Sequence, residues 1–410
     1  MPASVSTPLS VPPSTEAPTP SRRWVRLAAW PVVAVLALSN EPAPLYVLWQ
    51  RDLGFSSATL TLIYAFYIAG LLGTLTVAGT LSDRFGRKPV LVPGLLLGIV
   101  AGALFATAHS VPALALARLL SGIAVGAFLS AGLAAVTDVA DRADKRFAGL
   151  VASSSMVGGA AVGPLLAGVL SETLPGPSVT VFVVQIALLL AALPVVLRMP
   201  LPRPEGRPGL TGGGWIRIPN APRPHRRQLL LGLAVFAPAI AATGFVLSLG
   251  PTLLADLLHT SSRILSGVTI FGLFAAATGV QFAARRLRTR TDLLAGAALT
   301  VTSMAALALA VATTSVPALL ASAVLAGLGQ GLTQLGALTM LSANVPTSRL
   351  AEANAALTAG GYLLAGLLPV AAGTVSDATT LTTGTTAFAL AVTTLVTTGA
   401  LTVLRADRTP

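Results

Sequence analysis

Two charged side chains interrupt long apolar runs of this chain: Glu41, in the run nearest the N-terminus, and Arg118, in the fourth run. A charged group inside a membrane-length apolar segment is costly, so it indicates a function. A carboxyl group that exchanges protons beside a guanidinium can link proton movement to the binding of a solute. Two alternatives stay open. The first run could end early and leave Glu41 in water, and Arg118, about five residues inside its run, could reach the surface.

The segment around Glu41 reads Asn-Glu-Pro-Ala-Pro-Leu-Tyr over residues 40–46. Two prolines this close should break a helix and free main-chain carbonyl groups. At membrane depth such a break is tolerated only where the backbone is buried in protein or lines a cavity. Other polar side chains in the apolar runs are candidates for lining that cavity, although each could instead be a packing or interhelical hydrogen-bond residue. The candidates, including two from this segment, are Asn40, Tyr46, Tyr64, Tyr67, Gln330, Gln334, Asn354 and Tyr362.

The elements that must position these residues are membrane helices. The 410-residue chain is 54% hydrophobic and 10% charged, with a mean hydropathy of +0.81, whereas soluble proteins are about 25% charged. A membrane-spanning helix needs about 20 mostly apolar residues. We therefore predict an all-α integral membrane protein with twelve transmembrane helices. The runs are 27–48, 59–80, 89–108, 113–136, 148–170, 179–199, 228–250, 264–284, 292–312, 317–341, 351–374 and 383–404.

The segments outside these runs predict the domain organisation. Residues 1–25 begin with a stretch rich in Pro, Ser and Thr, and predict a disordered cytoplasmic N-terminal tail. Residues 200–227 are rich in Pro, Gly and Arg, and predict a cytoplasmic linker. The linker separates an N-terminal six-helix bundle at 26–199 from a C-terminal one at 228–404, and residues 405–410 form a C-terminal tail. The first run is a poor signal peptide, because residues 40–44 interrupt it.

The two halves resemble each other at an offset of 205 residues. The sequence Ser-Val-Pro-Ala-Leu at 110–114 recurs at 315–319. In the same register Gly122 and Gly126 match Gly327 and Gly331, and Pro164, Gly168, Ser171 and Glu172 match Pro369, Gly373, Ser376 and Asp377. Single matches can arise by chance between Ala-rich helices, but chance does not explain one register across two helices and their loop. We therefore predict two pseudo-symmetric six-helix bundles with a site at their interface.

The distribution of charge predicts the orientation. With both termini in the cytoplasm, the inside segments carry 23 of the 26 basic residues, and the outside loops carry only Arg51 and Arg263. This asymmetry follows the positive-inside rule. It also accounts for the net charge of +12 without any nucleic-acid partner. We expect an integral protein of the plasma (inner) membrane with both termini cytoplasmic.

Some kinds of chemistry are missing from the sequence. The chain has no Cys, which excludes disulfides and thiolate metal sites. No phosphate-binding Gly-x-x-x-x-Gly-Lys-Ser/Thr segment is present, so ATP is not expected to drive the protein directly. The alternative class is a membrane enzyme or a receptor that does not transport, but no cluster of nucleophile, base or metal ligands supports an enzyme. We expect no cofactor, no metal site and no enzymatic activity.

The loop between the second and third runs reads Gly-Thr-Leu-Ser-Asp-Arg-Phe-Gly-Arg-Lys over residues 79–88. It resembles the signature loop of the major facilitator superfamily of transporters, and all the motif positions match. Gly79 would let two helix ends approach closely, and Gly86 would permit a tight turn. The resemblance implies a latch between the two halves with Asp83 at its centre, and a merely solvated turn is the alternative. The motif residues are Gly79, Asp83, Arg84, Gly86, Arg87 and Lys88.

Two helix motifs extend the resemblance. Arg118 followed by Gly122 and Gly126 resembles the fourth-helix motif of the superfamily, in which glycines allow close packing. The fifth run resembles the Gly-x-x-x-Gly-Pro motif that marks antiporters and drug exporters more than uptake carriers, with Ala167 in place of a usual glycine. Generic packing of small residues is the alternative. The fifth-helix motif residues are Gly159, Gly163, Pro164 and Gly168.

The resemblance implies a secondary transporter that works by alternating access. We expect proton-coupled efflux of small hydrophobic or drug-like molecules, and uptake of a metabolite such as a sugar or an organic acid is the alternative. The first and fourth helices line the cavity in this superfamily, so Glu41 and Arg118 could meet there as the proton-coupling pair. The implied partners are the lipid bilayer, a small-molecule substrate and protons, and the chain is expected to act as a monomer.

Overall fold

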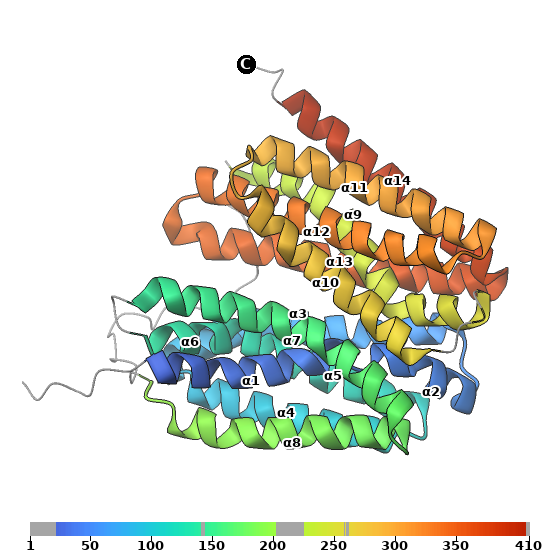
Figure 1. Cartoon of the computed structure of the whole chain (residues 1–410). Coiled ribbons are helices and arrows are strands. Elements are labelled where there is room, and N and C mark those ends of the chain that lie inside the picture. Colours follow the sequence, from blue (N-terminus) through green and yellow to red (C-terminus); the bar gives the residue numbers. More distant parts are fainter. Residues whose placement is uncertain (1–21, 141–143, 202–224, 258, 260–261, 407–410) are drawn as a thin grey trace, which may run out of the picture.

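The computed structural model describes residues 22–140, 144–201, 225–257, 259 and 262–406 of the chain. Within this part the regular elements are all helical, and 12 spans are long and apolar enough to cross a membrane. The predicted all-α membrane class is therefore confirmed. Figure 1 shows the helices lying side by side in two layers, with the N-terminal half (blue to green) below the C-terminal half (yellow to red).

The first six spans contain two that are interrupted by turns. The first span consists of α1 (Arg22–Asn40), a 3-10 turn (Ala43–Leu45) and α2 (Tyr46–Leu53). The fourth span consists of α5 (Val111–Ala127), a π-helical turn (Phe128–Gly132) and α6 (Leu133–Asp138). The continuous spans are α3 (Ser57–Phe85), α4 (Lys88–Ala106), α7 (Lys145–Thr173) and α8 (Pro177–Arg198).

The last six spans begin with α9 (Arg226–Thr252), which continues into a π-helical turn (Leu253–Leu257). The others are α10 (Arg263–Ala284), α11 (Thr289–Thr313), α12 (Val316–Asn344), α13 (Thr347–Ala378) and α14 (Leu381–Ala406). Each predicted run lies on one of these spans, and several helices extend past the apolar run into polar residues. Thus α1 begins at Arg22 and α14 ends at Ala406. Most of the predicted tail and linker, residues 1–21 and 202–224, lies outside the described residues.

The two ends of the helix bundle differ, and we name each by its residues. The motif end carries Asp83, and the capped end carries Glu172 and Asp377. The long helix α3 runs from the capped end to the motif end. At the capped end the halves are hydrogen-bonded to each other. Asp377 of α13 accepts hydrogen bonds of 2.9 Å from the main-chain N–H groups of Ser57 and Ala58, at the start of α3.

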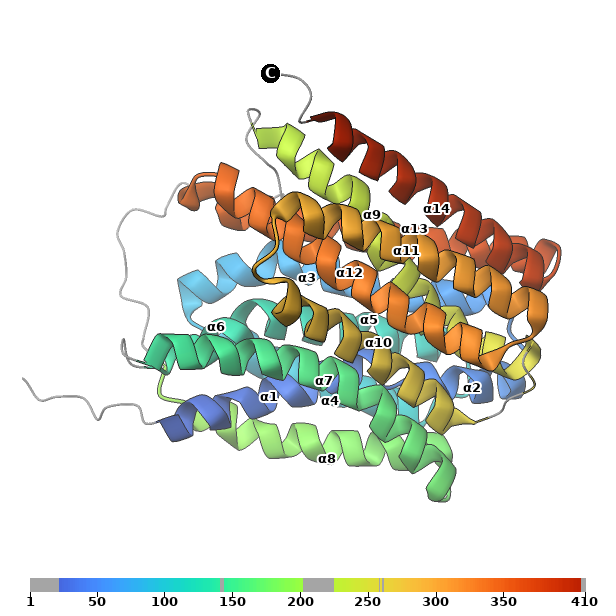
Figure 2. The same cartoon turned by 45° about the horizontal axis from the view of Figure 1, so that its top comes forward.

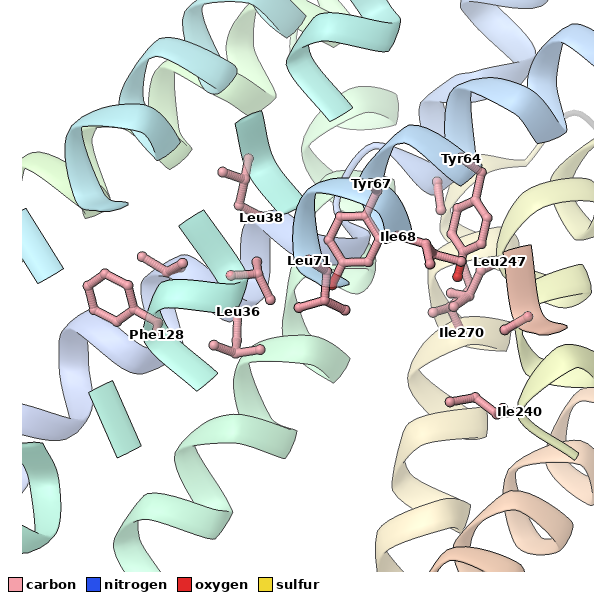
Figure 3. Close-up of a cluster of buried hydrophobic side chains, with 14 of the residues drawn as sticks. Leu36, Leu38, Tyr64, Tyr67, Ile68, Leu71, Phe128, Ile240, Leu247 and Ile270 are labelled. Atoms are coloured by element: carbon pink, nitrogen blue, oxygen red, sulfur yellow. The ribbon is translucent and has the colours of Figure 1, made fainter. Parts of the chain in front are cut away.

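The most extensive contacts between the halves are those of α3 with α13 and of α7 with α10. Figure 2 shows the second pair lying side by side. A buried hydrophobic cluster continues across the same boundary. In Figure 3, Tyr64 and Ile68 of α3 lie near Leu247 of α9 and Ile270 of α10. The interface between the halves is therefore largely apolar away from the capped end.

The predicted repeat is visible in the helix packing. A Cβ atom on Gly122 would lie 2.1 Å from the carbonyl oxygen of Tyr67, and one on Gly327 would lie 2.1 Å from that of Leu273. Each glycine thus lets its helix, α5 or α12, approach the backbone of α3 or α10. Two glycines 205 residues apart make the same contact in their own halves, which supports the predicted pseudo-symmetry.

Candidate substrate and proton site

The first span breaks where the sequence predicts a break. α1 ends at Asn40 and α2 begins at Tyr46, because Pro42 and Pro44 have no N–H group with which to continue the helix. The break is buried in protein, as such a break at membrane depth must be. Glu41 has an exposed fraction of 0%. The alternative that leaves Glu41 in water is therefore wrong.

Arg118 of α5 holds this break in place. Its side chain is also 0% exposed, so the alternative in which it reaches the surface is wrong as well. Nη1 donates a hydrogen bond of 2.7 Å to the carbonyl oxygen of Ser39, and Nε donates to the hydroxyl of Tyr46. The Ser39 carbonyl belongs to the last turn of α1, where carbonyl groups lack partners within the helix. The guanidinium therefore supplies a donor that the broken helix cannot.

Aromatic rings surround the Arg118 guanidinium. Its Cζ atom lies 5.1 Å from the ring centre of Tyr46, 5.8 Å from Tyr64, 5.7 Å from Tyr67 and 5.9 Å from Phe105. At such distances the electron-rich ring faces attract a cation. The three tyrosines are among the predicted cavity residues. Phe105, which lies on α4, was not predicted, because a lone Phe in an apolar run carries no signal of its own.

Glu41 lies in the break itself, directly after α1. Within the described part of the chain, both oxygens of its carboxylate are buried without a hydrogen-bond partner, as is Nη2 of Arg118. The two residues therefore lie on neighbouring spans without being hydrogen-bonded, although Arg118 binds residues on either side of Glu41 in the sequence. A buried carboxylate without a partner is costly. A proton, or a hydrogen-bond donor on a solute, can relieve that cost.

The remaining cavity candidates are divided between the halves. Asn40 donates from Nδ2 to the carbonyl oxygen of Ala160 on α7 over 3.4 Å. In the C-terminal half, Gln330 accepts a hydrogen bond of 3.1 Å from Thr243. The others in that half, Gln334, Asn354 and Tyr362, are half-buried. None of the hydrogen bonds made by Arg118 in the described residues reaches that half. The polar group at the broken helix is thus built by the N-terminal half.

The fifth-helix motif brings α7 against α1. A Cβ atom on Gly159 would lie 2.6 Å from the carbonyl oxygen of Val33, and one on Gly163 would lie 2.2 Å from that of Ala37. Pro164 is buried within α7. Gly168, one turn farther along, faces α10 of the other half instead. The motif therefore packs against α1, the helix that ends directly before Glu41, and also takes part in the contact between halves.

The signature loop is organised around Arg87. Its Nη1 lies 2.9 Å from Oδ1 of Asp83, and its Nε lies 3.0 Å from Oδ2 of Asp138. Burial alone would lower the pKa of Arg87, but hydrogen bonds and charges from both acids outweigh burial and raise it. Lys88 donates from Nζ to the carbonyl oxygen of Leu197 over 2.7 Å. These contacts all lie within the N-terminal half, so the role of Asp83 as a latch between halves stays a prediction.

Two expectations about this end of the molecule need correction. The fourth span does not end at residue 136, because α6 continues to Asp138, which pairs with Arg87. Gly79 does not mark a close approach, because a Cβ atom there would lie 3.6 Å from the hydroxyl of Ser130, an ordinary contact distance. Gly86 has a φ of +92° and ends α3, as the tight turn requires. Arg84 lies in the last turn of α3.

Comparisons with known proteins concern the family and the fold. The model of the Major Facilitator Superfamily matches residues 29–369. The Multidrug resistance protein MdtL of Klebsiella pneumoniae (strain 342) is 34% identical over 122 residues, and this match spans only 30% of each chain. The solved structure of the nucleoside transporter NupG (D323A mutant) has a TM-score of 0.74 at 13% identity, with 92% of this chain and 99% of that chain covered.

A second solved structure extends the likeness in fold. A bacterial homolog of the human lysosomal transporter Spinster, in an inward-facing and unoccupied conformation, has a TM-score of 0.67 at 16% identity. The alignment covers 96% of this chain and 98% of that chain. At such identities the likeness concerns the fold. The family match over most of the chain, together with the twelve spans, shows that this protein is an integral membrane transporter of the Major Facilitator Superfamily.

Proposed function

We propose that the protein exports small hydrophobic or drug-like molecules in exchange for protons, by alternating access, as a monomer in the plasma (inner) membrane. The observation that carries this proposal is Glu41, a fully buried carboxyl group at the break of the first span that has no hydrogen-bond partner among the residues that the structure describes. A carboxyl group in this setting favours its neutral form until a partner reaches it. Proton binding and solute binding can then exclude one another at one residue, so that arrival of the solute releases the proton.

Arg118 is the second member of the proposed site. Two of its nitrogens are held by the ends of the broken helix, and Nη2 makes no hydrogen bond to any described residue. A movement of α1 relative to α5 that brought Nη2 to the Glu41 carboxylate would join the two groups as an ion pair. The pair would favour the ionised carboxylate, and its separation would favour the protonated one. Solute binding that moves the first span therefore changes proton affinity, which is what coupling requires.

The surroundings of the site favour a hydrophobic solute. The tyrosine rings around Arg118 and the apolar cluster that crosses the halves offer stacking and apolar contacts with few fixed polar groups. The fifth-helix motif and the relative named for multidrug resistance support export over uptake. The relative matches only 30% of the chain, so its name supports the class of activity and not a particular drug.

The orientation is part of the proposal. The basic residues gather at the motif end and on the segments next to it, so we assign that end to the cytoplasm. The capped end then faces outside. Because the halves are hydrogen-bonded to each other at the capped end, we assign this structure to a state that is closed toward the outside.

The purified protein in proteoliposomes tests the proposal. The vesicles would contain a pH-sensitive dye, and lipophilic dyes such as ethidium would be added together with small sugars and organic acids as a panel. We expect lipophilic compounds to cause proton movement opposite in direction to their own. Proton movement in the same direction as a sugar or an organic acid would instead support the uptake alternative. No pH change with any compound would contradict proton coupling.

A further inference from the structure

The capped end contains two hydrogen-bonded contacts between the halves at equivalent positions of the repeat. In the first contact, Glu172 near the end of α7 accepts hydrogen bonds through Oε1 from the main-chain N–H groups of Arg263 and Ile264, the latter over 3.1 Å. Arg263 and Ile264 are the first two residues of α10. A carboxylate of the N-terminal half thus caps a helix of the C-terminal half.

The second contact is the counterpart of the first. Asp377, 205 residues after Glu172, caps the first two residues of α3, Ser57 and Ala58, with one oxygen on each N–H at 2.9 Å. Here the carboxylate belongs to the C-terminal half and the helix to the N-terminal half. Each half therefore gives one acid to the other and receives one, as a pseudo-two-fold arrangement requires.

The serines that precede these helices complete the caps. The first N–H groups of a helix have no partners within the helix. Ser56 accepts a hydrogen bond of 3.3 Å from the N–H of Thr59, and Ser262 accepts one of 3.1 Å from that of Leu265. In both helices the local serine covers the third N–H group, and the acid from the other half covers the first two. Opening of the capped end would leave these two N–H groups of each helix to water.

A glycine precedes each acid by one helical turn and lets the backbones approach. A Cβ atom on Gly168 would lie 2.5 Å from the carbonyl oxygen of Arg263, and one on Gly373 would lie 2.8 Å from that of Ser57. Because residues four apart lie on one face of a helix, the glycine and the acid meet the same partner helix. The pattern Gly-x-x-Ser-acid occurs at 168–172 and at 373–377.

We propose that Glu172 and Asp377 form a paired latch that holds the capped end closed and that must be released when this end opens. A carboxylate bound to main-chain N–H groups at a helix start is favoured both by hydrogen bonding and by the helix dipole. At exposed positions such as these, each cap should shift the ratio of open to closed molecules by about tenfold. The proposal rests on the proposed function only in that the protein alternates between two access states.

Distances between spin labels in the purified protein test the latch. The chain has no Cys, so introduced cysteines are labelled cleanly. A pair at His109 and Thr313, exposed residues of the two halves at the capped end, reports on that end. A pair at Arg146 and Ser342, also exposed, reports on the motif end. Measurements use detergent-solubilised protein without added solute or pH gradient.

The variants remove charge and keep size: Glu172→Gln, Asp377→Asn and the double variant. In Glu172→Gln, Arg263 still donates to Ser171 from Nε over 3.0 Å and from Nη2 over 2.6 Å, so the double variant gives the clearest test. We expect each single variant to raise the population with a long capped-end distance by about tenfold. The double variant should raise it by more than either single one.

The two label pairs distinguish a latch from a merely stabilising contact. Loss of a latch lengthens the capped-end distance and shortens the motif-end distance in the same molecules, whereas local loosening broadens only the first. Asp52→Asn, an exposed acid on α2 outside both caps, is the matched control and should keep the parent distances. If the double variant does not fold, the single variants carry the test.

Unchanged distances at both ends in the folded variants would overturn the latch. Broadening at the capped end alone would also overturn it and leave only a local stabilising contact. Because neither solute nor proton gradient is present, these outcomes do not depend on what the protein transports. The latch can fail while export is confirmed, and export can fail while the latch is confirmed.

Discussion

Nη1 of Arg118 lies 2.7 Å from the carbonyl oxygen of Ser39, so a charged side chain of the fourth span completes the hydrogen bonding of the broken first span. The contact fixes the guanidinium to the end of α1 and leaves Nη2 without a hydrogen bond among the described residues. Arginine suits this task because its planar fork donates in two directions at once, toward Ser39 and toward the Tyr46 hydroxyl.

Arg118→Lys should therefore lower both the stability and the transport activity of the protein, although it keeps the positive charge. A lysine ammonium is a point donor and cannot reproduce the fork, so the Ser39 carbonyl or the Tyr46 hydroxyl loses its partner at a cost of about 1–3 kcal/mol. We expect a lower unfolding temperature and at least about a tenfold loss of transport. Tryptophan fluorescence during heating measures the unfolding temperature, and dye export from vesicles measures transport. A lysine variant with parental stability and transport would show that the fork is not required.

Neighbouring glycines of α7 offer a matched pair for the helix-packing argument. A Cβ atom on Gly159 would lie 2.6 Å from the carbonyl oxygen of Val33, whereas one on Gly158 would have no neighbour within 4 Å. Gly159→Ala should force α7 from α1 and cost about 1–3 kcal/mol. Gly158→Ala should be neutral or stabilising by up to about 1 kcal/mol, because alanine favours a helix over glycine. The free energy of unfolding in detergent is measured for both variants. Equal changes in Gly159→Ala and Gly158→Ala would contradict the packing account.

Asp83→Asn tests the signature loop. The Asp83 side chain is 57% exposed and pairs with Arg87, which also holds Asp138. Loss of one exposed pair should change stability by less than about 1 kcal/mol. If the loop sets the balance between access states, transport should fall severalfold while solute affinity stays close to the parental value. Asp144→Asn, which breaks the pair with Arg22 at the same end, is the control. Parental transport in Asp83→Asn would support a merely solvated turn.

The orientation can be tested with the same cysteine-free chain. Ser178, at the start of α8, lies at the capped end, and Thr211 lies in the predicted linker, outside the described residues. In intact cells an impermeant thiol reagent should label a cysteine at Ser178 and spare one at Thr211, because the basic segments stay inside. The opposite labelling pattern would reverse the assignment of the two ends.

The sequence predicts the fold because lipid imposes a local rule. Each span must be long and apolar, so hydropathy alone finds all twelve. The break after Asn40 is also local, since Pro42 and Pro44 cannot donate hydrogen bonds. Helix ends are less predictable, because polar residues such as Arg22 extend a helix without adding to the apolar signal. This is also why the fourth predicted run stops at residue 136, whereas α6 continues to Asp138.

The site was predictable only in part, because its contacts depend on how distant helices meet. Charge inside an apolar run identifies Glu41 and Arg118, but nothing in the run of α4 distinguishes Phe105 from any other core residue. Glu172 and Asp377 lie at helix ends, where acids are common, and their role needs the position of the other half. The repeat, which matches these two acids at an offset of 205, was the available signal.

Glu41→Gln is the substitution that tests the central claim most directly. Glutamine keeps the size of the side chain and removes the exchangeable proton. The matched control is Glu352→Gln, which removes an acid of the same type from a surface pair with Arg349. The measurement is accumulation of a lipophilic dye such as ethidium in proteoliposomes under an imposed pH gradient. The account predicts that Glu41→Gln binds the dye but no longer concentrates it, while Glu352→Gln behaves as the parent protein does. Accumulation by Glu41→Gln against a gradient at the parental level would contradict the account, because Glu41 would then not be the coupling residue.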